Sequence, residues 1–344
     1  EGLRRLAEIR RLPARFGWPQ SILGYAVLTV GVCLILHPAP REVVAAAVFG
    51  VLVGTLRYFT RGQPTLQILA PVMAAFSVSA LSALAVRHDI TDPGLAAMVA
   101  SLVIFLPGAA LTTSVLELAA GQMVSGASRL VSGGVQLALL AFGILAGIEA
   151  VGVPPSRVLS RSPDLLGAWS PWLGVLVFAV GVVVAYSAPR GSSLGFLVVL
   201  YAAWVGQVLG NAAFGGYVSA FVGAAVMTVA AFVTARLVPA ALPTHALSLP
   251  GFWLLVPGAL GLIGLTELAR GSGGEDLVAT VGSIFGVALG ILCGTQLLAW
   301  AVASGRIVGE LSDSIADRGR WLRRRWRTSH PAPPEGNDEN TPPE

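Results

Sequence analysis

Two Pro-Gly pairs interrupt long apolar runs and are the residues best placed to bind a small molecule. Pro107-Gly108 occurs first, and Pro257-Gly258 follows 150 residues later in the same local context. Proline removes a backbone donor and glycine relaxes the backbone, so each pair should divide its helix into two half-helices. Each second half-helix would begin with free N–H groups and the positive end of its dipole, a combination that binds carboxylates.

The two motifs differ in their side chains. The first continues with Thr112 and Thr113, whose hydroxyls could bind a substrate hydroxyl or ammonium group, or could bond back to their own helix. The second carries Gly261 and Gly264, and small residues let helices pack closely. We therefore expect side-chain contacts from the first motif and close backbone approach from the second. The ligand class that this favours is a small organic anion or zwitterion.

The composition is that of a polytopic membrane protein. Of 344 residues, 55% are hydrophobic and 12% are charged, whereas a soluble domain carries about a quarter charged residues. The sequence therefore predicts an all-α fold with about ten transmembrane helices, of which helices four and nine are broken by the Pro-Gly pairs. Apolar stretches of about 20 residues, the length that crosses the hydrocarbon core, occur at 19–36, 42–57, 65–86, 94–116, 131–153, 170–187, 192–210, 216–238, 249–268 and 277–304.

Carboxylates recur in the two motifs. Glu117 and Glu267 occupy equivalent positions. A carboxylate in a membrane span is costly, and its protonation can be coupled to a gradient, so we expect a role in proton coupling or gating. The alternative is an ion pair at headgroup level with Arg129 or Arg270. Other polar residues in the spans are expected to join helices by hydrogen bonds: Gln136, Gln207, Asn211 and Gln296.

An internal repeat extends beyond these motifs. Ala39-Pro40-Arg41 matches Ala188-Pro189-Arg190, each at the end of an apolar run. This match favours a membrane span over a cleavable signal peptide for the first run. Each half then holds five spans, an odd number, so the second half must enter the membrane upside down. The predicted architecture is a 5+5 inverted repeat, which is typical of secondary transporters.

Domain boundaries follow from this repeat. Residues 19–153 and 170–305 are the two predicted five-helix membrane repeats, joined by an external linker at 154–169. Residues 1–18 are expected to be a cytoplasmic linker helix that follows a missing upstream soluble domain. In 306–344, clustered Arg and Trp residues should bind anionic lipid headgroups, and the polar tail that follows should be disordered.

The distribution of arginines predicts the orientation. All 22 basic residues are Arg, a bias typical of a GC-rich bacterial genome. Most of them lie in the terminal segments and the even-numbered loops, so both termini should be cytoplasmic. The alternate loops hold Arg41, Arg87, Arg157, Arg161 and Arg270.

The first Pro-Gly motif resembles a known family. The pattern PGxxLTxxxxDL, followed by a short loop and SGxxRL, is similar to the first membrane half of the bacterial threonine/serine exporters, the ThrE-like proteins. Pro250-Gly251 and the motif after it look like the family's other membrane module, so that the resemblance covers residues 1 to about 305. The acidic residue departs from the family's usual Asp, because this chain has Glu117. The first pattern is carried here by Pro107, Gly108, Leu111, Thr112, Glu117, Leu118, Ser125, Gly126, Arg129 and Leu130.

The resemblance implies export of threonine and serine, driven by the proton motive force across the bacterial cell membrane. Related two-subunit members are linked to dicarboxylate export, which keeps that substrate class open, and a non-transporting structural subunit is the third alternative. A homo-oligomer is compatible with the sequence. No cofactor, metal ion or nucleic-acid partner is expected.

An enzyme and a passive channel are both disfavoured. His37, His88, His245 and His330 all fall in loops or in the tail, and no nucleophile-base pair or metal-ligand cluster is found. The spans also lack the continuous polar lining of a channel.

Overall fold

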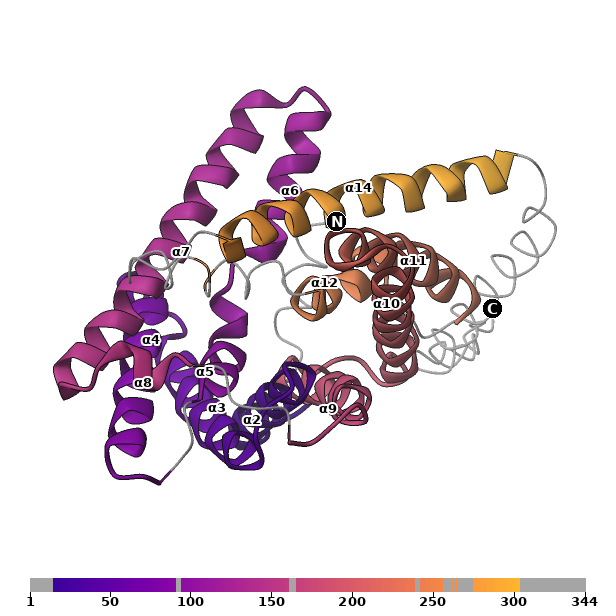
Figure 1. Cartoon of the computed structure of the whole chain (residues 1–344). Helices are drawn as coiled ribbons and strands as arrows, with labels where there is room; N and C mark the ends of the chain where they lie inside the picture. The colour runs from indigo at the N-terminus through magenta and orange to yellow at the C-terminus, as the bar shows by residue number, and fades with distance from the viewer. Residues whose placement is uncertain are drawn as a thin grey trace, which may run out of the picture.

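The computed structural model describes residues 15–90, 94–160, 165–238, 242–255, 262, 264 and 275–303. Helices form all the regular structure in this part of the chain, so the predicted all-α fold is confirmed (Figure 1). The helices of the first half are α2 (Trp18–Ile35), α3 (Pro40–Thr60), α4 (Pro64–Arg87), α5 (Leu95–Leu102), the 3₁₀ turn η1 (Val103–Phe105), α6 (Gly108–Ala119) and α7 (Met123–Val151). Those that follow are α8 (Pro155–Val158), α9 (Ser170–Ala185), α10 (Ser193–Phe214), α11 (Gly216–Leu237), α12 (Thr244–Leu254) and α14 (Glu275–Ala303).

Seven of the described helices are long and apolar enough to cross a membrane, and the number is eight if the bent pair α5–α6 counts as one span. Helix α9, with 16 residues, is slightly too short to be counted. The predicted span 249–268 lies largely outside the described residues. The chain is therefore a multi-pass helical protein. The total of ten transmembrane helices stays a prediction.

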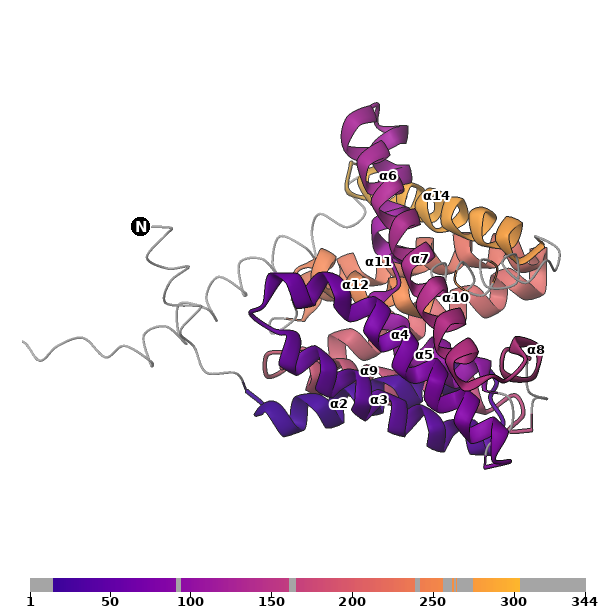
Figure 2. The same cartoon turned by 90° about the vertical axis from the view of Figure 1, so that its left-hand side faces the viewer.

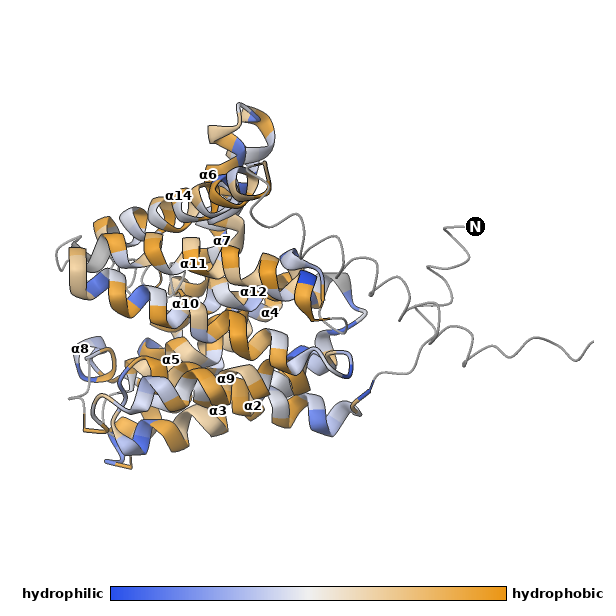
Figure 3. Cartoon of the chain, turned by 90° about the vertical axis from the view of Figure 1, so that its right-hand side faces the viewer, coloured by the Kyte–Doolittle hydropathy of each residue, from blue (hydrophilic) through white to orange (hydrophobic). Residues whose placement is uncertain are grey.

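The outer surface of the helices is apolar, as a lipid-facing surface must be. Ile68, Phe142 and Leu297 all expose most of their side chains on the outside of long helices. In Figure 3, hydrophobic residues run along the helices and hydrophilic residues gather towards helix ends. Helix α7, with 29 residues, is about 43 Å long and exceeds a hydrocarbon core of about 30 Å. It begins eight residues before the predicted span at 131–153, and its first turns form a hairpin with α6 that projects from the rest of the chain (Figure 2).

Glycines allow the close contact between α2 and α9. A Cβ atom at Gly31 would collide with the backbone of Phe178, and one at Gly181 would collide with the backbone of Leu28. Nearer the start of α2, Gly24 faces Ala185. The residue numbers of the contacts therefore fall along α9 as they rise along α2. The two helices are therefore antiparallel. Small residues let the backbones approach this closely, which replaces the hydrophobic driving force that lipid cannot supply.

Two further pairs use glycines spaced four residues apart. Gly143 and Gly147 of α7 lie against the backbone of α4, and Gly290 and Gly294 of α14 lie against the backbone of α11. In both pairs the contact advances in the same direction along each helix, so the helices are parallel. The three glycine interfaces therefore each join one pair of helices, which are α2–α9, α4–α7 and α11–α14.

We expect Gly31→Ala to destabilise the protein by about 1–3 kcal/mol, because the added methyl group must displace backbone atoms of α9. Gly134→Ala is the matched control, since Gly134 is also helical but has no atom within 4 Å of the added Cβ position. Thermal unfolding of the purified protein in detergent measures both. Equal unfolding temperatures for the two variants would contradict the proposed packing of α2 on α9.

Candidate functional site

The first Pro-Gly motif breaks its helix, as the sequence predicts. Helix α5 ends at Leu102, the single 3₁₀ turn η1 follows, and α6 begins at Gly108 with Pro107 as its N-cap residue. The two segments are bent by 57°. Proline lacks the N–H group that a continuous helix would need at this position, so the regular hydrogen-bond ladder stops here.

Side chains from neighbouring helices satisfy carbonyl groups on the α5 side of the break. The Gln136 side-chain amide of α7 donates to the Phe105 carbonyl at 2.6 Å, and the Tyr25 hydroxyl of α2 donates to the Ser101 carbonyl at 2.7 Å. Gln136 thus joins helices, which is the role that the sequence predicts for it. Non-helical backbone at membrane depth is tolerated only where other groups replace the lost bonds in this way.

On the donor side of the break, no partner is found among the described residues. The first bond within α6 runs from the Leu111 N–H to the Pro107 carbonyl at 2.8 Å. The N–H groups of Gly108, Ala109 and Ala110 precede it, and no side chain caps this end of α6. With the helix dipole, these groups form an anion-binding end on a helix of 12 residues.

The hydroxyls that follow differ in their bonding. Thr113 donates to the Ala109 carbonyl at 2.7 Å, and Ser114 donates to the Leu111 carbonyl at 2.6 Å, so both bond back to their own helix. Thr112 is fully buried, and its hydroxyl has no hydrogen-bond partner. A buried polar atom without a partner costs about 1–3 kcal/mol, and such an atom calls for a functional explanation. Of the two predicted threonines, Thr112 is therefore the one whose hydroxyl is available to a ligand.

Glu117 forms an ion pair with Arg129. The Arg129 Nε atom lies 2.9 and 3.1 Å from the two carboxylate oxygens. The Arg129 side chain is 52% exposed and that of Glu117 is 17% exposed. This contact joins α6 to α7 in the projecting hairpin. An ion pair with Arg129 is the alternative to proton coupling that the sequence left open, and a role of Glu117 in coupling stays a prediction.

The second motif lies outside the described residues. Pro257, Gly258 and Glu267, which the sequence predicts to complete the site, all lie outside the described residues. Helix α12, which ends at Leu254, precedes this motif in the sequence.

Two features of the structure were not predicted from the sequence. Glu42 is almost fully buried at the start of α3, where its carboxylate accepts the Ala39 N–H at 2.8 Å and so caps the helix. Arg57, near the end of α3, lies 4.8 Å above the ring of Tyr186, which stacks on Trp253 of α12 with ring centroids 5.8 Å apart. The position of Glu42 three residues after Ala39 could have revealed the cap. No sequence signal pairs Arg57 with aromatic rings more than a hundred residues away.

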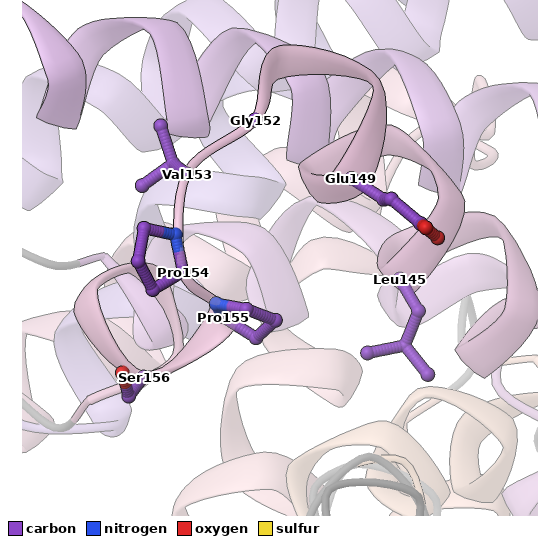
Figure 4. A pocket seen from close by; sticks show the side chains of 7 residues that line it. All are labelled: Leu145, Glu149, Gly152, Val153, Pro154, Pro155 and Ser156. Carbon is purple, nitrogen blue, oxygen red and sulfur yellow. The ribbon is translucent and has the colours of Figure 1, made fainter.

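A surface hollow of about 730 Å³ lies beyond the end of α7 (Figure 4). Glu149 is the one charged residue among those that line it, and its position near the C-terminal end of α7 separates it along the helix from Gln136 at the break. The hollow therefore does not belong to the broken-helix site. Its other lining residues are Leu145, Gly152, Val153, Pro154, Pro155 and Ser156.

The apolar helices and the broken helix define a multi-pass helical membrane protein. Residues 1–151 match the family model described as "Putative threonine/serine exporter". This match confirms the predicted resemblance for residues 1–151, and it includes the broken helix and the Glu117–Arg129 pair. This points to a transporter rather than an enzyme. No curated protein and no solved structure matches the chain.

Proposed function

We propose that the protein is a secondary active exporter of threonine and serine in the bacterial cell membrane. The family of its first half supports this activity. The observation that carries the proposal is the Thr112 hydroxyl, which is buried and unpartnered one turn into a half-helix whose first N–H groups are open. Such a site offers donors for a carboxylate and a separate polar group for a second substituent of the same small molecule.

The geometry of an α-helix places the two parts of this site together. Residues four apart lie on one face, and side chains tilt towards the N-terminus of the helix. The Thr112 side chain therefore points back towards Gly108. In our proposal the N–H groups of Gly108 and Ala109 bind the substrate carboxylate, and the Thr112 hydroxyl bonds the hydroxyl of threonine or serine. Pro107 keeps the donors free, and the Thr113 hydroxyl takes no part.

We propose further that the chain is a 5+5 inverted repeat. Gly24 and Gly31 of α2 have counterparts 150 residues later, Gly174 and Gly181 of α9, and each pair contacts the other helix at an equivalent depth. An antiparallel pairing of equivalent helices is what a two-fold axis in the membrane plane produces. The matching interfaces α4–α7 and α11–α14 also support the repeat. Pro257-Gly258 would then break the ninth of ten spans and complete the site from the opposite direction.

The arginine asymmetry supports cytoplasmic termini, with the loop 154–169 outside.

Export against a gradient needs a driving force, and we propose proton antiport through Glu117 and Glu267. Protonation of Glu117 would remove the negative charge that holds Arg129 and so loosen α6 from α7. We also propose, from the sequence alone, that the Arg and Trp residues in 306–344 bind anionic lipid headgroups.

Thr112→Val removes the unpartnered hydroxyl and keeps the shape of the side chain. We expect the half-saturation concentration for threonine and serine to rise about five- to tenfold, while that for alanine stays unchanged. Thr113→Val is the matched control, because its hydroxyl already bonds to the Ala109 carbonyl. Exchange of labelled amino acids in liposomes containing purified protein measures both. Equal effects of the two substitutions, or no effect of Thr112→Val, would refute the proposed contact.

Glu117→Gln tests the coupling. We expect the variant to retain threonine exchange across the liposome membrane but to lose stimulation of net efflux by a pH gradient, because glutamine cannot release a proton. Arg129→Gln keeps the carboxylate but removes the partner that protonation of Glu117 would release, so it should lose the stimulation as well. If both variants respond to the gradient as the wild type does, Glu117 serves only to hold α6 against α7.

A further inference from the structure

Two unpartnered polar atoms lie on one face of α10. The indole Nε1 of Trp204 and the side-chain oxygen of Gln207 are both buried and have no hydrogen-bond partner. They are three residues apart in the middle of the helix, a spacing that makes side chains neighbours on a helix surface. One is a donor and the other is an acceptor. Each would destabilise the fold by leaving a hydrogen bond unmade, so a pair of them on one face calls for a ligand.

The pair lies where α10, α11 and the end of α12 converge. A Cβ atom at Gly223 of α11 would lie 3.1 Å from the Ala203 carbonyl oxygen, 3.2 Å from the Gln207 Cβ and 2.7 Å from a methyl group of Leu255. Leu255 follows the last residue of α12, the helix that precedes the second Pro-Gly motif in the sequence. Gln207 therefore lies beside the end of α12.

An aromatic cluster holds the Trp204 ring. Trp172 of α9 contacts it edge to face at 6.3 Å and stacks on Tyr201 at 6.5 Å. The Tyr201 hydroxyl in turn donates to the Trp172 carbonyl at 2.8 Å. Because its neighbours are fixed in this way, the Trp204 N–H group is held in place as a preorganised donor.

We propose that Trp204 and Gln207 form a second polar contact site, which recognises the amino acid by its donor and acceptor groups together. The inference rests on the proposed function, and it favours a hydroxy amino acid over a dicarboxylate as the substrate. The indole N–H donates to a carboxylate or hydroxyl oxygen, and the Gln207 oxygen accepts from an ammonium or hydroxyl group. A zwitterionic hydroxy amino acid satisfies both atoms. A dicarboxylate carries no donor at neutral pH and leaves the Gln207 oxygen unpaired, so the site disfavours it.

Trp204→Phe removes the indole N–H and keeps an aromatic ring, and Gln207→Leu removes the amide oxygen and keeps a side chain of similar size. Equilibrium binding of L-threonine and of succinate to the purified full chain in lipid nanodiscs, together with thermal unfolding, tests the inference. We expect wild-type protein to bind L-threonine more tightly than succinate. Each substitution should raise the dissociation constant for L-threonine about five- to tenfold, and Gln207→Leu should do so without lowering the unfolding temperature.

Leu209→Ala is the control on the same helix, because the Leu209 side chain is exposed on the outside of α10 and carries no polar atom, and it should leave the affinity unchanged. Unchanged L-threonine affinity in both the Trp204 and Gln207 variants would overturn this inference, and the proposed exporter function would stand if Thr112→Val still impaired exchange. Tighter binding of succinate than of threonine by the wild-type protein would overturn the substrate class. A wild-type protein that bound and exchanged neither threonine nor serine would instead refute the proposed function itself.

Discussion

The requirement that every backbone polar group in a membrane find a partner governs this structure. Pro107 interrupts the backbone hydrogen bonds of a helix at one point, and side chains of neighbouring helices replace some of the lost partners. Gln136 and Tyr25 reach from α7 and α2 to carbonyl groups on one side of the break. Within the part of the chain that the structure describes, the amide groups that open α6 receive no such partner. A structure that satisfies acceptors and leaves donors open at the same break is suited to an anionic ligand.

Glycine interfaces make this arrangement possible. Helices in lipid gain little from hydrophobic burial against one another, so close backbone contact has to hold them together. Gly31 and Gly181 join α2 to α9, and α2 in turn carries Tyr25 to the break. Arg57 adds a link between α3 and the rings of Tyr186 and Trp253. The two halves of the chain therefore meet both at the glycine interface and near the helix that precedes the second motif in the sequence.

Sequence patterns predicted the features that depend on local chemistry. Hydropathy indicated the long helices, and the Pro-Gly pair indicated the break at Pro107 because proline acts on its own turn. Hydrogen-bond partners depend on packing, and here the sequence was less informative. It treated Thr112 and Thr113 alike, although only Thr113 bonds back to its helix, and it assigned Gln207 to joining helices, whereas the Gln207 oxygen has no partner. Glu42 was overlooked because it lies at the edge of an apolar run.

The central claim is that the break at Pro107 keeps backbone donors free for a substrate carboxylate. The half-saturation concentration for threonine exchange in liposomes, compared between Pro107→Ala and Pro71→Ala, tests it most directly. Pro71 lies inside the continuous helix α4, so its replacement restores a helical hydrogen bond without touching the break. The account predicts an increase of about tenfold or more for Pro107→Ala and none for Pro71→Ala. Wild-type half-saturation in a folded Pro107→Ala protein would contradict it.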